Sequence, residues 1–157
     1  AILCDTDAPV SDAGIPVIRA KNVRLALAQM AAAFYARQPE HIVAITGTDG
    51  KTSTADFFRQ FWHGMGMSSA SIGTLGTLAG DGRILSPGSH TTPDPVELHR
   101  LLSDIAGQGV THVAMEASSH GLHQYRLDGV KLQAAAFTNI ARDHLDYHKD
   151  EDDYFSA

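Results

Sequence analysis

The feature that most constrains the fold is a glycine-spaced loop, Gly47-Thr48-Asp49-Gly50-Lys51-Thr52, between a strand-like and a helix-like segment. Residues 41–46 are mostly apolar, as in a short buried strand, and residues 54–63 have helical spacing. The phenylalanines of this helix are expected on one side: Phe57, Phe58 and Phe61. A strand, a glycine loop and a helix in this order predict an α/β unit whose loop faces an anion.

The residue types in the loop suit a nucleotide triphosphate. Gly47 and Gly50 let the backbone approach phosphate oxygens closely, Lys51 can neutralise the β- and γ-phosphates, and the Thr52 hydroxyl can bind Mg²⁺. The full phosphate-loop pattern needs a glycine where the chain has Ile45, so only the shorter G-x-x-G-K-T form is present. An ordinary glycine turn before a helix therefore remains an alternative for these residues taken alone.

Composition sets limits on the class of protein. The chain has 157 residues, 43% of them hydrophobic, which is enough for one main core. Its formal charge is −6, and acidic residues cluster in the segment 143–153. This balance argues against nonspecific binding to nucleic acid or to anionic membranes. Any bound anion must be held by local positive groups.

Cysteine usage and hydropathy indicate the compartment. Cys4 is the only cysteine, which excludes an intramolecular disulfide and fits a reducing environment. No apolar run approaches the roughly 20 residues needed to cross a bilayer, and residues 1–20 lack a signal-peptide pattern. We expect a cytoplasmic protein.

Residues 1–40 are expected to be the end of a preceding domain plus a linker helix. Ile2 to Asp5 and Val17-Ile18 are strand-like but have too few partners for a stable sheet, so an N-terminal region is expected to be missing. Asn22 can cap a helix that ends near Pro39. Its apolar residues recur at helical spacing: Val23, Leu27, Met30, Ala31 and Phe34.

The remaining segments alternate strands with helices. Residues 69–73 predict a strand and residues 77–85 a hairpin that turns at 80–82. Asp94 and Pro95 begin a helix with an apolar stripe that stops at Gly107. The runs 110–116 and 132–139 predict buried parallel strands. The fold class is therefore α/β, with a P-loop and a mostly parallel, doubly wound sheet, and its ligands are expected at the carboxyl ends of the strands.

Glu116 ends one of these strands, so its carboxylate should emerge beside the phosphate loop. A hard cation prefers oxygen ligands, and Thr52 with Glu116 would supply two of them. A surface acid at a strand end is the alternative for Glu116 taken alone. Other polar blocks follow the loop, and they are Thr91-Thr92-Pro93-Asp94, Glu116-Ala117-Ser118-Ser119-His120-Gly121-Leu122 and Arg142-Asp143-His144-Leu145-Asp146-Tyr147-His148.

Together with the loop, these blocks resemble the Mur ligases of peptidoglycan synthesis, from about residue 15 to the end of the chain. The chain is most similar to the members that add the third amino acid, meso-diaminopimelate or else L-lysine, to UDP-N-acetylmuramoyl-L-alanyl-D-glutamate. The resemblance implies an ATP-dependent amide ligase of cell wall biogenesis, which serves cell shape and cell division. ATP would phosphorylate a substrate carboxylate, and the amine of the amino acid would attack the acyl phosphate.

The resemblance also implies roles for individual residues. Lys51, Glu116 and His144 would be catalytic, and Thr52, Glu116 and His144 would bind Mg²⁺. The residues implied for ATP are Gly47, Thr48, Asp49, Gly50, Lys51, Thr52 and Ser53. Those implied for the muramyl substrate are Thr91, Thr92, Ser118, Gln124 and Arg126. The guanidinium of Arg126 suits an anion, because it can make a two-pronged contact.

Further expectations concern three residues near these sites. His148 is expected to be structural or to face solvent, and His120 to form local hydrogen bonds. Asp49 stands where the family commonly has Asn, and its charge is unfavourable if it faces phosphate. We therefore expect its carboxylate to turn inward and accept N–H groups of the loop.

The resemblance divides the chain at about residue 40. Residues 1–40 would end a UDP-binding domain and residues 41–157 would begin a central ATP-binding domain, with the amino-acid-binding domain and a metal-bridging carbamylated lysine lying beyond Ala157. Such a piece is expected to be inactive alone, and the parent protein is expected to be monomeric. Two alternatives remain: a ligase like folylpolyglutamate synthetase, or a noncatalytic ATP-binding module.

Overall fold

A computed structural model describes residues 1–10, 14–88 and 90–157. A six-stranded sheet dominates the fold, with the strand order β6-β5-β4-β7-β3-β8, and a separate two-stranded sheet pairs β1 with β2. The strands are β1 Ile2–Asp5, β2 Val17–Ala20, β3 His41–Thr46, β4 Ser69–Gly73, β5 Gly76–Ala79, β6 Ile84–Ser86, β7 His112–Glu116 and β8 Ala134–Phe137. The helices are α1 Val23–Tyr35, α2 Lys51–Gly64, α3 Pro95–Gly107, α4 Ser119–His123 and α5 Glu151–Ser156.

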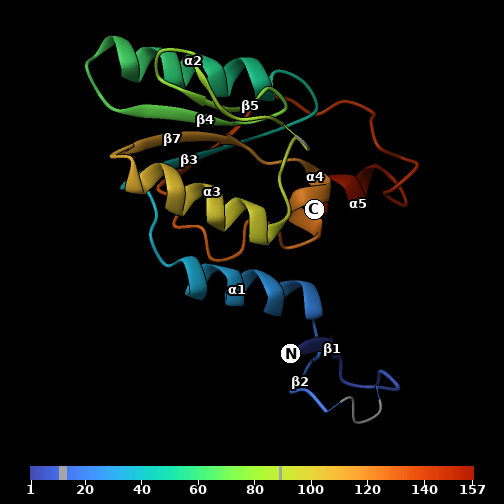
Figure 1. The fold of residues 1–157 in the computed structure, drawn as a ribbon. Coiled ribbons are helices and arrows are strands. Elements are labelled where there is room, and N and C mark those ends of the chain that lie inside the picture. Colours follow the sequence, from blue (N-terminus) through green and yellow to red (C-terminus); the bar gives the residue numbers. More distant parts are fainter. Residues whose placement is uncertain (11–13, 89) are drawn as a thin grey trace.

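The centre of the large sheet is parallel, as the sequence predicts. β4 pairs with β7, β7 with β3, and β3 with β8, all in parallel. β5 and β6 add an antiparallel edge through the predicted hairpin, so the sheet is mixed. Helix α2 covers one face and α3 covers the other, which is the doubly wound arrangement (Figure 1).

Two apolar layers hold the helices on the sheet. Between the sheet and α3 lie residues such as Ile42, Ile72, Leu98, Leu102 and Met115. The α3 cap forms as predicted, because the Asp94 carboxylate accepts the N–H groups of Val96 and Glu97 at 2.9 and 3.1 Å. The layer under α2 is smaller. It contains Ile45, Ala55 and Ala114, with Val43, Phe58, Trp62 and Ala136 packed against them.

The prediction that the three phenylalanines share one side of α2 is wrong. Phe58 packs on the sheet, but Phe57 and Phe61 are exposed, Phe61 by 68%. Arg59 takes a buried place instead, because Asp56 and the carbonyl oxygens of Ala79 and Gly80 pair with its guanidinium. The β5–β6 hairpin supplies two of these acceptors, and such a partner cannot be read from helical periodicity.

Helix α1 begins at the predicted cap, since Asn22 Oδ1 accepts the N–H of Leu25 at 3.0 Å. It ends at Tyr35, before the predicted end near Pro39. Its buried residues are Ala28 and Ala31, whereas three of the predicted apolar positions are exposed: Leu27, Met30 and Phe34. The small residues are buried because α1 lies close to α3. It also lies close to the loop at Gly129, where an added Cβ would lie 2.4 Å from Ala32 Cβ.

The chain before α1 extends away from the large sheet (Figure 1). Its two strands do pair, in parallel, with Ile2 opposite Val17. Gln38 fixes the other end of α1 by bonding to the loop before β8, at Gly129 O and Lys131 N. None of the described helices is both long enough and apolar enough to span a membrane.

Candidate nucleotide-binding and metal site

The predicted polar residues do meet at the carboxyl edge of the parallel strands. The register aligns Ile45 with Glu116, and Thr46 with Phe137. The phosphate loop after β3, the Glu116 side chain of β7 and the segment Thr138-Asn139 after β8 therefore lie at one edge. The turn after β4 joins them there, because Ile72 is aligned with Met115.

The phosphate loop, residues 47–50, is held by residues that follow β8. Thr48 N donates to Asn139 O and Asp49 N to Asn139 Oδ1, both at 3.0 Å. Thr138 Oγ1 donates to Asp49 O at 2.6 Å. Gly47 has a φ of 129°, and a Cβ there would lie 2.1 Å from Thr138 Oγ1, so only glycine fits this approach. The sequence places Asn139 at the end of a predicted strand but gives it no role in holding the loop.

Asp49 does not behave as expected. Its carboxylate accepts no hydrogen bond from the described residues, and the residue is exposed. The prediction that it turns inward to accept loop N–H groups is therefore wrong. The amide oxygen of Asn139 accepts its N–H instead, so the loop does not need the Asp49 carboxylate.

Helix α2 begins directly after the loop, at Lys51. Its N-cap is Gly50 in the left-handed conformation, with no side-chain cap. The first N–H groups of a helix have no acceptor within the helix, so Lys51, Thr52 and Ser53 offer theirs toward the loop. Lys51 Nζ folds back over the loop and donates to Gly47 O at 2.6 Å and to Thr48 O at 2.8 Å.

Glu116 is buried beside the start of α2. It is 2% exposed, and its carboxylate accepts three hydrogen bonds. Thr52 Oγ1 donates to Oε2 at 2.9 Å, Thr74 N donates to Oε1 at 2.8 Å, and Thr74 Oγ1 lies 3.3 Å from Oε2. Gly73 permits this contact, because a Cβ there would lie 2.1 Å from Glu116 Oε1. Thr74 is absent from the predicted site residues.

The Thr52–Glu116 pair has the chemistry of a hard-cation site. The Thr52 hydroxyl donates a hydrogen bond to the carboxylate, so the lone pairs of the hydroxyl oxygen are available for a cation. His144 does not join this pair. Among residues 1–10, 14–88 and 90–157, no group of three or more His, Cys, Asp and Glu side chains is arranged to hold a metal ion.

His144 lies instead in a group of rings. Its backbone N–H donates to Asp143 Oδ1 at 2.8 Å, its Nε2 lies 3.5 Å from Asp143 Oδ2, and its φ is 53°. The ring of His120 is 4.7 Å away. Burial lowers the pKa of His120, and the nearby His144 lowers it further. His120 forms no hydrogen bond with its ring among the described residues, so its expected local hydrogen bonds are not found.

His148 is structural and does not face solvent. It is 2% exposed and its Nε2 lies 3.0 Å from Ser119 Oγ. Its Nδ1 is 3.5 Å from Asp153 Oδ2 and has no hydrogen-bond partner among the described residues. This histidine joins α4 to the segment that leads into α5.

The predicted substrate residues form one network. Thr92 is 1% exposed, and its Oγ1 bonds to Glu116 O, Ser118 Oγ and Ser118 N. Ser118 Oγ also caps α4 by accepting the N–H of Gly121. Thr91 Oγ1 lies 3.1 Å from Thr74 Oγ1. The side chains of Thr92 and Ser118 are thus occupied within the protein, and they hold the Glu116 strand end in place.

Arg126 and Gln124 form the half-buried part of this network. Arg126 Nη1 donates to Thr92 O at 2.7 Å, while Nε and Nη2 donate to Gln124 Oε1 at 3.2 and 2.8 Å. A guanidinium has five N–H groups, so two remain for a ligand. Gln124 Nε2 in turn donates to the Tyr147 hydroxyl at 3.1 Å, which also bonds to His123.

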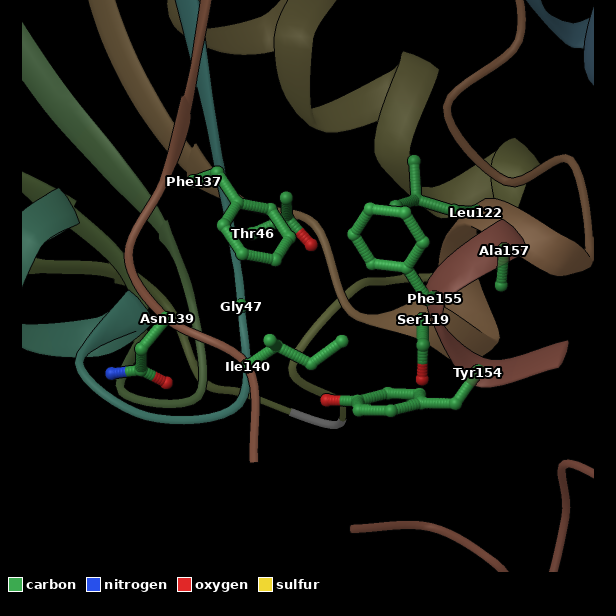
Figure 2. Close-up of a pocket in the computed structure, with 10 residues that line it drawn as sticks. All are labelled: Thr46, Gly47, Ser119, Leu122, Phe137, Asn139, Ile140, Tyr154, Phe155 and Ala157. Atoms are coloured by element: carbon green, nitrogen blue, oxygen red, sulfur yellow. The ribbon is translucent and has the colours of Figure 1, made fainter. Parts of the chain in front are cut away.

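An apolar pocket of about 250 Å³ adjoins the loop at Thr46 and Gly47 (Figure 2). Phe137, Ile140 and Phe155 point into it from different segments. The Tyr154 hydroxyl at its rim bonds to Thr48 Oγ1 at 3.0 Å. Lys51, Thr52 and Glu116 do not line this pocket, and Thr52 and Glu116 border only a small recess of about 10 Å³. The Thr52–Glu116 pair and this apolar pocket therefore lie near each other but are separate.

Comparison with known proteins adds relatives of the whole chain. A protein of Brucella melitensis is 54% identical over 162 residues, covering 100% of this chain and 32% of its own length. One of Rhizobium meliloti is 55% identical over 157 residues, with the same coverage. Both are named UDP-N-acetylmuramoyl-L-alanyl-D-glutamate--2,6-diaminopimelate ligase. The chain thus spans about a third of the length of these relatives.

Solved structures agree with this fold. A structure with the same ligase name matches 99% of this chain and 31% of its own, with a TM-score of 0.80 and 29% identity. Escherichia coli FolC, in complex with DHPP and ADP, matches 83% of this chain and 36% of its own, with a TM-score of 0.60 and 19% identity. At 19% identity, the match to FolC shows a shared fold alone.

A family profile covers the part of the chain that carries the site. The family described as Mur ligase middle domain matches residues 45–157, which include the phosphate loop, Glu116 and His144. With the relatives and the sheet topology, this match places the chain in the Mur ligase family.

Proposed function

We propose that the chain is part of a MurE-type ligase, which uses ATP to join meso-diaminopimelate to UDP-N-acetylmuramoyl-L-alanyl-D-glutamate in peptidoglycan synthesis. One observation carries the proposal: Lys51, Thr52 and Glu116 meet at the carboxyl edge of the sheet, beside helix N–H groups that no described side chain caps. The names of relatives at 54 and 55% identity supply the substrates. L-lysine is the alternative amino acid.

The loop and α2 would hold the phosphates of ATP. Helix N–H groups at Lys51, Thr52 and Ser53 point toward the loop and favour negative charge. Lys51 now bonds two carbonyl oxygens of the loop, so it would exchange these for phosphate oxygens, which are stronger acceptors for an ammonium group. Because several negative charges must gather here, positioning and cations would supply most of the rate enhancement.

Mg²⁺ fits the oxygen donors of Thr52 and Glu116. When bound, it would neutralise the charge that develops on the transferred phosphoryl group. Glu116 accepts the hydrogen bond of the Thr52 hydroxyl, so the lone pairs of that oxygen would be available to the ion. We assign His144 to a second Mg²⁺. This assignment requires the segment around His144 to move from its contacts with Asp143 and His120.

The two unused N–H groups of Arg126 would bind an anionic group of the muramyl substrate. Gln124 fixes the plane of the guanidinium, and Thr92 O fixes its end. ATP would phosphorylate the substrate carboxylate at this edge, and the amine of the incoming amino acid would displace phosphate and form the amide. Residues held by the sheet would thus orient both reacting groups.

The domain organisation follows from this family assignment and remains part of the proposal. Residues 1–40 would end a UDP-binding domain and include the linker helix α1, while residues 41–157 would begin the ATP-binding domain. The amino acid would bind to a domain outside this chain, so the chain alone would be inactive. We place the full-length ligase in the cytoplasm as a monomer.

The test is phosphate release by the full-length protein with ATP, Mg²⁺ and the UDP-muramoyl dipeptide. meso-Diaminopimelate and L-lysine are added in separate reactions. Release that requires the dipeptide and one amino acid would establish the ligase and identify the acceptor. Release that requires a folate and glutamate would favour a folylpolyglutamate synthetase-like ligase. Nucleotide binding with no turnover under either condition would favour a noncatalytic module.

A further inference from the structure

Thr74 contacts Glu116 although it lies at the surface. It follows β4 and is exposed, whereas the Glu116 side chain is buried. Its N–H donates to Glu116 Oε1 at 2.8 Å, and its hydroxyl lies 3.3 Å from Oε2. Both carboxylate oxygens therefore contact the same residue, which fixes the plane of the carboxylate.

The hydroxyl of Thr74 also reaches the substrate side of the site, since Thr91 Oγ1 is 3.1 Å away. A hydroxyl has one proton, and an ionised carboxylate only accepts. The geometry makes Thr74 Oγ1 the donor in both contacts, so its single proton is shared between Glu116 Oε2 and Thr91 Oγ1. Thr52 donates to the same oxygen of Glu116. Thr52 and Thr74 thus both donate to Glu116, and Thr74 also contacts Thr91.

We propose that Thr74 is a positioning residue, which orients the Glu116 carboxylate beside Thr52 and links it to Thr91. The proposal rests on the proposed function for its link to turnover, but its geometry does not depend on that function.

The position of Thr74 separates it from the packing of the core. The residue is exposed, and it is not a member of either apolar layer. Thr111 is a matched control, because its hydroxyl also bonds within the protein, to Ser68 O at 3.1 Å and to His112 Nδ1 at 2.8 Å. Thr111 lies at the opposite end of β7, away from Glu116.

The experiment compares Thr74→Val, Thr74→Ser and Thr111→Val in the full-length protein. Calorimetric titration measures ADP affinity with Mg²⁺ and with EDTA, and steady-state kinetics measure kcat and KM. Valine keeps the shape and the backbone N–H but removes the hydroxyl. We expect Thr74→Val to reduce the Mg²⁺-dependent gain in ADP affinity, and kcat, by about tenfold, which matches the loss of one hydrogen bond to a charged group.

Serine restores the hydroxyl, so Thr74→Ser should stay within about twofold of the wild type, and Thr111→Val should match the wild type. An unchanged Mg²⁺ gain in Thr74→Val would overturn the proposal, as would equal losses in Thr74→Val and Thr111→Val. If the wild type binds ADP with Mg²⁺ but never turns over, the proposed function fails while the binding comparison still decides the role of Thr74. No Mg²⁺ gain in the wild type would overturn both.

Discussion

The two ends of the strands β3 and β7 both gather polar side chains, but they use them differently. At the amino end, the rings of His41 and His112 lie 4.4 Å apart and Trp62 packs on His112 at 5.3 Å. His41 Nδ1 pairs with Gln133 Oε1 at 2.7 Å, and Thr111 pairs with His112. Polar atoms there bond to neighbours within the same cluster.

At the carboxyl end, several donors are left over. The first N–H groups of α2 have no side-chain cap, and two N–H groups of Arg126 have no partner among the described residues. A polar cluster is therefore a candidate binding site when the protein holds hydrogen-bond donors in place but does not supply their acceptors. Changes at the carboxyl end should therefore affect turnover, and changes at the amino end should affect stability.

The largest effect should come from Lys51→Ala in the full-length protein. The change removes the cation nearest to the expected phosphates, so we expect kcat/KM to fall about 1,000-fold, as when a charge-stabilising donor is lost. Lys131→Ala, an exposed lysine, is the control and should change little. Phosphate release measures both. Comparable activity in the two variants would contradict the assignment of Lys51.

Gly73→Ala should have the next largest effect. The new Cβ would lie 2.1 Å from Glu116 Oε1 and 2.6 Å from its Cδ, so the carboxylate must leave Thr52. We expect about a 100-fold loss of kcat, because a misplaced group costs much of its catalytic contribution. The control is Gly64→Ala, which has open space around its Cβ. Full activity of Gly73→Ala would show that the observed Glu116 position is not needed.

His144→Asn removes the imidazole ring but allows the same backbone conformation, so it tests the ring alone. The φ of 53° is left-handed, which asparagine tolerates well. We therefore expect the melting temperature to be kept while kcat falls about tenfold or more, as for residues that tune a metal site. His41→Asn, at the amino end, should leave kcat unchanged. Equal kcat in both variants would remove His144 from the site.

The smallest effect should be a change in stability at the amino ends of β3 and β7. Burial lowers the pKa of His112, and the neighbouring His41 lowers it further. As pH falls below about 6.5, the unfolded chain takes up a proton at His112 that the folded chain resists, so the unfolding free energy falls. His112→Phe should therefore lose less melting temperature between pH 7.5 and 5.5 than the wild type. A loss equal to that of the wild type would refute this, and turnover at pH 7.5 should not change.

The sequence predicts the regular elements well but not all of their contacts. Local signals predict the helix caps Asn22 and Asp94 and the hairpin that turns at 80–82, because these features depend on nearby residues. The predicted placement of the apolar residues on α1 and α2 is partly wrong, because the buried side of each helix depends on a distant partner. Ala28 and Ala31 meet closely packed neighbours, and Arg59 meets the hairpin carbonyls.

The same limit applies to the candidate site. The order of the strands predicts that Lys51, Thr52 and Glu116 share an edge, because parallel strands bring their carboxyl ends together. The sequence does not indicate Thr74, and it places Asn139 at this edge without a role in holding the loop, since their bonds join residues 42 and 90 positions apart. Gly73 is the signal that could have indicated Thr74: a glycine at a strand end next to a buried carboxylate marks a close approach.

The bonds that hold the phosphate loop have a consequence for the order of folding. Asp49 and Thr48 depend on partners at Asn139 and Ala141, which are 90 and 93 residues away. Contacts so distant in sequence form only after the intervening chain has been ordered, so they tend to form late. A chain emerging from the ribosome would complete β3 and α2 long before its loop could keep this shape. Competence to bind a nucleotide should therefore be among the last properties that this part of the protein acquires.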